Sequence, residues 1–314
     1  MRRRPSRLMT ATAVGVIAIV TVAGCEARVY GTPPVAPDAP RLTVVVPQGS
    51  MAPLPEASPG EFSPAFEGLQ ERTDAATAAA SDAGADITVL VLDRNSGQQI
   101  SNGNTTTIAI ASVVKLFIAD DLLLQEAKGE TVITPEDREQ LDVMLRSSDD
   151  SAAEVFWNRS GGSEIVTRVA ARYGLASTQP PNDGRWWNTI STAADLVRYY
   201  DMLMNGSGGL PQEQANVILS NLAQSTPNAI DGTQPGGTYP QRFGIPDGLY
   251  AEPVAVKQGW MCCIGSDWMH LSTGVVGPNR RFIMVIGSLQ PTDSDTARDT
   301  ITDAVKAMFP NGRI

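Results

Sequence analysis

The stretch TTTIAIASVVKLFIADDLLL, residues 105–124, suggests how the rest of the chain is organised. Ser112 is a small hydroxyl residue that precedes an apolar run of good helix formers, a pattern that predicts the start of a helix. Residues three apart share a helix face, so Ser112 and Lys115 are expected to lie side by side. A serine hydroxyl is a weak nucleophile unless a base takes its proton, and lysine can be that base when burial lowers its pKa. Because S-x-x-K also occurs by chance in many helices, the pair needs partners elsewhere in the chain.

The N-terminal residues indicate export and a lipid anchor. Four arginines within residues 2–7 precede an apolar run over 8–22, which is shorter than the ~20 residues that a spanning helix needs. The run ends in Ala-Gly-Cys25, which resembles the bacterial lipoprotein box. The resemblance implies a signal peptide over 1–24, cleavage before Cys25 and a lipid on that cysteine; an ordinary secretory signal with an incidental cysteine is the alternative. The Pro/Ala-rich residues 25–62 are then a tether to the outer face of the cell membrane.

The charge of the chain excludes several classes of partner. The 314 residues carry 24 Lys+Arg and 34 Asp+Glu, a net charge of −10, and loss of the four N-terminal arginines gives 20 − 34 = −14. An acidic domain without a basic run is not expected to bind nucleic acid. It is not expected to adhere electrostatically to anionic lipid either, so the acyl chains on Cys25 are the expected membrane contact.

The order of the expected elements predicts an α+β fold. Strands are expected near both ends of residues 63–314 and helices in the middle, which favours a mainly antiparallel sheet flanked by helices, with an all-helical part inserted. We assign the α/β part to 63–105 and 245–314 and the helical part to 106–244. The expected strands are 87–92, a short one through Ile100, 254–260, 268–276 and 281–288. The expected helices are 63–84, 112–124, 134–145, 151–157, 165–173, 192–204, 211–222 and 295–308, with 223–253 left as a Gly/Pro-rich loop.

Two further motifs follow Ser112 and Lys115 in the chain. Ser148-Asp149-Asp150 lies at a junction between helices, and Lys257-Gln258-Gly259 lies on an expected strand. The order S-x-x-K, S-D-x, K-x-G resembles the serine β-lactamase and penicillin-binding protein family, whose motifs are S-x-x-K, S-D-N and K-[TS]-G. The resemblance covers roughly residues 63–310 and implies a sheet of five strands.

The resemblance also implies roles for individual residues. Ser112 would be the acylated nucleophile, Lys115 its general base, and Ser148 a proton shuttle to the leaving group. Lys257 would hold an anionic group of the substrate, and Met261 would share an oxyanion hole with the backbone N–H of Ser112. Asp150, Gln258, Gly259 and Trp186 complete the expected substrate-binding residues.

Three departures from the family pattern change the expected chemistry. Asp150 replaces an asparagine, so it cannot donate to a carbonyl unless protonated, and it could instead pair with Lys115 and keep that lysine charged. Gln258 replaces a hydroxyl residue. No E-x-x-L-N precedes Thr189, and in class A β-lactamases that glutamate activates the deacylating water, so efficient β-lactam hydrolysis is not expected.

Several of these residues also have purely structural interpretations. Ser148 and Asp149 are good N-cap residues, Lys257 could be a surface strand residue, and Trp186 could anchor a loop. Of the adjacent Cys262 and Cys263, one is expected to fill the core and the other to face a pocket or a second layer, since neighbours on a strand point to opposite faces. A bond between them is the less favoured alternative.

Two functional classes remain open. One is a serine hydrolase or peptidase that acts on a cell-wall peptide or a related amide or ester through acyl-Ser112. The other is a degenerate domain that binds a peptidoglycan-like ligand or a protein partner. His270 is the chain's one histidine and no metal-ligand spacing occurs, so neither a metal site nor a cofactor is expected.

Overall fold

The computed structural model describes residues 63–231 and 235–314. The predicted signal peptide, the lipidation site Cys25 and the tether lie outside the described residues. The described residues belong to one compact unit. Among the described helices, none has both the length and the apolar character needed to cross a membrane.

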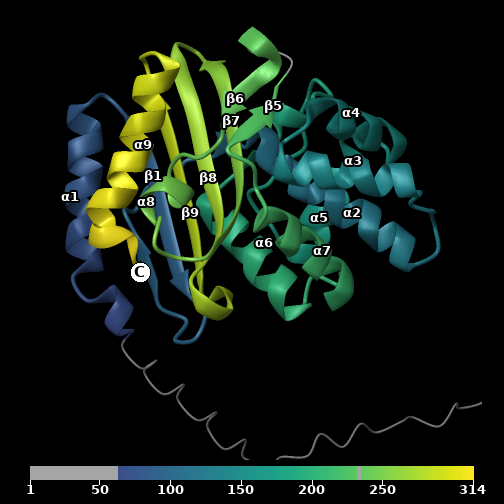
Figure 1. Cartoon of the computed structure of the whole chain (residues 1–314), viewed down its shortest axis with the longest axis horizontal. Helices are drawn as coiled ribbons and strands as arrows, with labels where there is room; N and C mark the ends of the chain where they lie inside the picture. The colour runs from purple at the N-terminus through teal and green to yellow at the C-terminus, as the bar shows by residue number, and fades with distance from the viewer. Residues whose placement is uncertain (1–62, 232–234) are drawn as a thin grey trace, which may run out of the picture. The chain divides into compact units, whose positions relative to one another are not determined.

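A five-stranded antiparallel sheet joins the two ends of the described chain (Figure 1). Its strand order is β2-β1-β9-β8-β7, and every neighbouring pair is antiparallel. The strands are β1 (Asp86–Asp93), β2 (Gln99–Ser101), β7 (Val254–Ile264), β8 (Asp267–Val276) and β9 (Phe282–Gln290). Strand β7 is an edge of this sheet, and it carries the predicted K-x-G motif to the border of the helical part.

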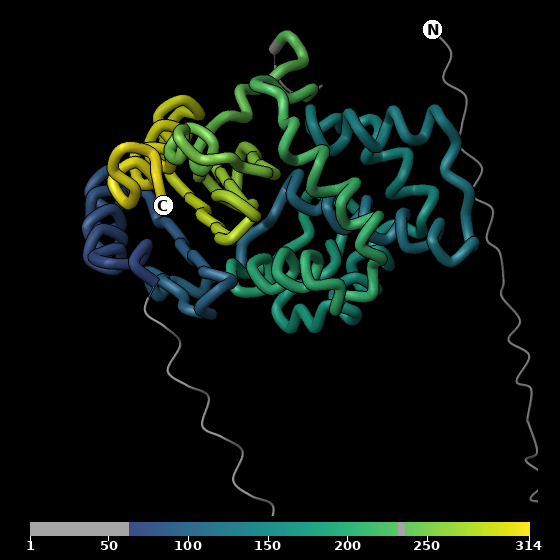
Figure 2. The backbone as a smooth tube through the Cα atoms, turned by 60° about the horizontal axis from the view of Figure 1, so that its bottom comes forward, coloured from purple at the N-terminus to yellow at the C-terminus, as the bar shows by residue number. Residues whose placement is uncertain are grey.

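The two faces of the sheet bury different cores, because alternate side chains of a strand point to opposite faces. Ile87, Val89 and Val91 of β1 belong to the core beneath α1 (Leu69–Asp82) and α9 (Ser294–Met308). Leu90 and Leu92 belong to the larger core shared with the helical part. Figure 2 shows α1 and α9 side by side on one side of the sheet and the helical part on the other.

The helices that follow Ser112 in the chain form a helical part beside the sheet. Thr134 begins one of its helices with a reciprocal capping box, in which its hydroxyl accepts from Asp137 N–H and the Asp137 carboxylate accepts from Thr134 N–H. The helices of this part are α2 (Lys115–Ala127), α3 (Pro135–Arg146), α4 (Asp150–Arg159), α5 (Glu164–Tyr173), α6 (Ala193–Asn205) and α7 (Gln212–Leu222).

The predicted loop over 223–253 contains more structure than expected. Strands β5 (Asn228–Ile230) and β6 (Thr238–Pro240) pair with each other, and α8 (Ile245–Gly248) is a short helix that packs near α9. Elements of three or four residues leave too short a pattern to be recognised in a Gly/Pro-rich segment. A second small pair, β3 (Ile108–Ala109) with β4 (Ile190–Ser191), fixes the backbone just ahead of Ser112.

Candidate functional site

Ser112 lies in a 3-10 turn, Ala111–Val114, directly before α2. The turn is held by β7, because the Cα of Gly259 approaches it so closely that an added Cβ would lie 2.5 Å from the carbonyl oxygen of Ile110. Ala111 has a left-handed φ of 42°, which is unusual for a residue with a side chain. The absence of a side chain at Gly259 therefore allows β7 to approach the turn that carries Ser112.

The side chain of Lys115 is fully buried and connects the first two motifs. Its Nζ lies 2.9 Å from Ser112 Oγ, 2.6 Å from the carbonyl oxygen of Ser148 and 2.6 Å from Oδ1 of Asp150. These three acceptors can take all three protons of an ammonium group. A neutral amine would keep the contacts to Ser148 and Asp150 as a donor and direct its lone pair at Ser112, as a base requires.

Two opposing influences act on the protonation of Lys115. Burial lowers the pKa of Lys115 below its usual value, because a charged ammonium loses its hydration there. The carboxylate of Asp150 opposes this shift, and its side chain remains one-third exposed. The predicted pairing of Asp150 with Lys115 is thus present in the structure.

Ser148 bridges the two lysines. Lys257 Nζ donates to Ser148 Oγ at 2.7 Å, and Lys115 Nζ lies 3.2 Å from the same oxygen. Burial and the nearby charge of Lys115 lower the pKa of Lys257 well below its usual value. Ser148 has a left-handed φ of 55°, a conformation that turns its side chain toward the lysines while Asp149 caps α4 by accepting from Ala152 N–H. Ser148 therefore contacts the two lysines, as the family resemblance implies, while its neighbour Asp149 is the N-cap of α4.

A cavity of about 850 Å³ opens beside Ser112. Of the sequence-predicted residues, Ser112, Asp150, Trp186 and Met261 line it, whereas Lys115, Ser148 and Lys257 lie behind its wall. The full lining is Ala111, Ser112, Asp150, Ser151, Glu154, Val155, Asn158, Trp186, Trp187, Asp231, Trp260, Met261, Cys262 and Trp268.

Gln258 does not line this cavity, contrary to its expected contact with substrate. Its side chain is buried, and its Nε2 donates to the carbonyl oxygen of Phe243 at 2.6 Å. The cause is strand alternation, because Lys257 points toward Ser148 and its neighbour Gln258 must point to the other face of the sheet.

The indole ring of Trp186 lies over the amine of Lys115. Lys115 Nζ lies 4.7 Å from the centroid of the Trp186 ring, and Trp186 Nε1 donates to Glu154 at 3.1 Å. Sequence reasoning missed Glu154, although it follows Asp150 by one helical turn and that spacing could have indicated a shared face. Trp186 is therefore both a buried loop anchor and part of the cavity wall.

Asp231 and Trp260 also line the cavity, and the sequence did not mark them as site residues. Trp260 Nε1 donates to Asp231 at 2.9 Å, and the Trp260 ring stacks on Tyr239 with centroids 4.7 Å apart. Asp231 follows β5 within the predicted loop, so no periodicity marked it. His270 is buried behind this wall, where its Nε2 is 2.7 Å from the Tyr239 hydroxyl and burial lowers its pKa to about 3.

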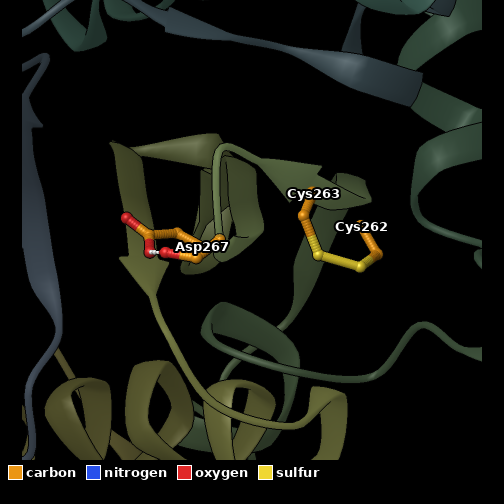
Figure 3. The surroundings of a disulfide bond; sticks show 4 residues. Cys262, Cys263 and Asp267 are labelled. Atoms are coloured by element: carbon orange, nitrogen blue, oxygen red, sulfur yellow. Dashed lines mark hydrogen bonds between the residues drawn. A yellow bond between two sulfur atoms is a disulfide. The ribbon is translucent and has the colours of Figure 1, made fainter.

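Cys262 and Cys263 form a disulfide at the rim of the cavity, so the expectation of a core filler is wrong. Both residues are exposed, and Cys262 lines the cavity. The regular register of β7 with β8 breaks between Met261 and Ile264, which removes the alternation on which the expectation rested. Figure 3 shows the disulfide on β7 with the side chain of Asp267, on the neighbouring strand, pointing away from the two sulfur atoms. Within residues 63–231 and 235–314, no group of three or more His, Cys, Asp or Glu side chains could hold a metal ion.

Comparison with known proteins gives a full-length relative and a set of similar folds. No family model matches the chain. The lipoprotein LppW of Mycobacterium tuberculosis is 60% identical over 329 aligned residues that cover 100% of both chains, and LppW of Mycobacterium bovis is equally similar.

The similar solved structures have low sequence identity. A class A β-lactamase from Mycobacterium abscessus has a TM-score of 0.59 and 19% identity, over 75% of this chain and 97% of its own. The protein PBP-A has a TM-score of 0.62 and 15% identity, over 77% of this chain and 95% of its own. The TLA-1 β-lactamase has a TM-score of 0.62 and 13% identity, over 78% and 98%. At these identities the likeness establishes the fold alone, and it confirms the predicted β-lactamase-like fold class.

Proposed function

Because the chain belongs to the family of the mycobacterial lipoprotein LppW and has a β-lactamase-like fold, we propose that it is a membrane-anchored serine acyltransferase or hydrolase. The observation that carries the proposal is the contact of Ser112 Oγ with Lys115 Nζ at the wall of an 850 Å³ cavity. The substrate class is an amide or ester of the kind found in cell-wall peptides, and the reaction passes through acyl-Ser112.

Acylation moves one proton through the buried cluster. Ser112 Oγ attacks the substrate carbonyl carbon while its proton passes to the neutral amine of Lys115. The resulting oxyanion accepts hydrogen bonds from the backbone N–H of Ser112 and, as the family resemblance implies, from that of Met261. When the intermediate collapses, the bond to the leaving amine or alkoxide breaks and Ser148 hands it a proton, which is replaced from Lys115.

Deacylation is expected to be slow. Trp186 lies over Lys115, and the loop before Thr189 contributes no carboxylate to the Ser112–Lys115 contact. An acyl group on Ser112 would therefore persist until a water or an acceptor amine reaches it without help from a dedicated base. This favours transfer or slow hydrolysis over rapid β-lactam turnover.

The membrane anchor is part of the same proposal. The relative LppW is named as a lipoprotein and is similar along its whole length, which supports lipidation of Cys25 here. The protein would then be held at the cell membrane on its extracytoplasmic side, with access to peptide in the cell wall. Export to an oxidising compartment also agrees with the disulfide at Cys262.

A binding function is the second candidate, and the Lys115–Asp150 ion pair is the observation that favours it. An ammonium held by Asp150 at 2.6 Å has no lone pair for Ser112. The same cavity would then hold a cell-wall ligand or a protein partner without chemistry.

One experiment separates the two candidates. The purified protein and its Ser112→Ala variant are treated with a β-lactam or with a serine-reactive fluorophosphonate and weighed intact over several hours. An adduct on the wild-type protein that the variant lacks supports acyl chemistry. If neither reagent gives an adduct, and cooperative unfolding shows that the protein is folded, the enzymatic proposal is wrong and the binding function remains.

A further inference from the structure

We propose that the cavity beside Ser112 selects ligands that carry a cationic group, which it receives between Glu154 and the faces of the tryptophan rings that line it. This rests on the proposed function in one respect: the cavity is taken to be the place where the substrate of Ser112 binds. The family resemblance implied the reverse, an anionic group held by Lys257.

The expected anion site is closed. The Lys257 side chain is almost fully buried, and its Nζ is occupied by Ser148 Oγ at 2.7 Å and the carbonyl oxygen of Gln258 at 3.3 Å. Lys257 is not part of the cavity lining, and no other lysine or arginine of the described residues is either. An anionic ligand group would therefore enter a space that offers it no cationic side chain.

The charged side chains that do line the cavity are acidic. Asp150 is engaged from behind by Lys115 Nζ at 2.6 Å, whereas the carboxylate of Glu154 is exposed and accepts only from neutral donors. These donors are Trp186 Nε1 at 3.1 Å and Asn158 Nδ2 at 2.9 Å. A carboxylate that is fixed by neutral groups keeps its full charge for a ligand.

The cavity also offers aromatic surface, which attracts cations through the negative face of the ring. Trp187 stands edge-on to Trp186 with centroids 5.0 Å apart, and both line the cavity, as do Trp260 and Trp268 across it. Trp186 already has the amine of Lys115 over its ring, and Trp187 has the guanidinium of Arg185 at 5.8 Å. The protein thus already places basic groups against these two rings, and Trp187 and Trp268 remain partly exposed.

The position of Glu154 sets the reach of the ligand. It lies one helical turn beyond Asp150 on α4, about 6 Å further along the helix axis. Asp150 contacts the same amine as Ser112, so a positive group roughly 6 Å from the reacting carbonyl can meet Glu154. A short alkylammonium chain has this length.

Three matched ligands test the proposal by equilibrium binding. They share one unreactive alkyl amide and end in an ammonium, its neutral N-acetyl derivative, or a carboxylate, and the Ser112→Ala variant is titrated with each while tryptophan fluorescence is recorded. We expect the ammonium ligand to bind about tenfold more tightly than the acetylated one, and the carboxylate ligand most weakly. Glu154→Gln should remove most of the preference, while Glu213→Gln on α7, outside the cavity, should leave it intact.

The outcomes distinguish this inference from the proposed function. Because binding is measured without Ser112, a preference for the ammonium ligand supports the cation site even if no acyl adduct ever forms. Equal binding of the three ligands, or tightest binding of the carboxylate ligand, overturns the cation site and leaves acyl chemistry at Ser112 unaffected. Tighter ammonium binding that survives Glu154→Gln overturns the role given to Glu154.

Discussion

Replacement of Asp150 by asparagine changes the protonation of Lys115 while it preserves shape. In the structure Lys115 Nζ lies 2.6 Å from Asp150 Oδ1. The asparagine variant keeps an oxygen that can accept this hydrogen bond but removes the negative charge. Because that charge opposes the effect of burial, the pKa of Lys115 should fall further when it is lost. A larger fraction of the lysine is then the neutral amine that can take the proton of Ser112.

The separation of the two groups gives the size of the effect. Two unit charges 2.6 Å apart interact by about 1.6 kcal/mol when fully screened by water, which equals roughly one pKa unit. Since Asp150 is one-third exposed and Lys115 is buried, this screened value is a lower bound. The pH at which acylation reaches half its maximum should therefore move down by about one unit or more, with about a tenfold faster reaction below the midpoint.

The assay is the rate of adduct formation on Ser112 by an uncharged fluorophosphonate, followed by intact mass between pH 5 and 10. Asp303→Asn on α9, where the carboxylate pairs with exposed Lys306, serves as the matched control and should leave the profile unchanged. A profile for Asp150→Asn that stays in place or moves to higher pH would refute the idea that Asp150 restrains Lys115.

Three further outcomes are expected. Gly259→Ala should slow adduct formation more than tenfold and destabilise the protein by about 1–3 kcal/mol in urea unfolding, because the new Cβ meets the Ile110 carbonyl oxygen; unaltered kinetics would contradict the close approach. The pKa of His270 is about 3 in the folded protein, so between pH 3 and 6.5 the unfolded chain binds a proton that the folded protein does not. The free energy of unfolding should therefore rise by about 1.4 kcal/mol per pH unit over this range, and urea unfolding of His270→Phe should lack this contribution. Asp120→Ala should destabilise the protein by about 3–5 kcal/mol, since it leaves the partly buried guanidinium of Arg172 without its carboxylate, and a loss below 1 kcal/mol in the same unfolding assay would argue against that pair.

The parts of the site that the sequence predicts are those with short-range patterns. The S-x-x-K spacing places Ser112 beside Lys115 on one helical turn, and the hydroxyl and acidic residues before α4 predict a helix start. The presence of strands at both ends of the domain predicts the α+β class, because the middle of the chain has only helical periodicity. These features depend on neighbours in the chain, so a single sequence contains enough information.

The remaining features depend on long-range packing. The orientation of Gln258 away from the cavity follows from strand alternation, but only once Lys257 is known to face Ser148. The disulfide between Cys262 and Cys263 depends on a local break in strand register, and no residue type in the sequence predicts that break. Glu154 gains its importance from Trp186, which lies 32 residues away and reaches it across the cavity wall.

The strand order of the sheet has a consequence for biosynthesis. Strand β9, the last strand of the sheet in chain order, lies between β1 and β8, so the two parts of the sheet are joined only after synthesis has passed Gln290. Strand β7 positions the Ser112 turn through Gly259, and β7 reaches the rest of the sheet only by way of β8 and β9. Ser112 is therefore synthesised early, but its surroundings are assembled late. A chain that stops before Phe282 would contain every motif residue and still lack an ordered site.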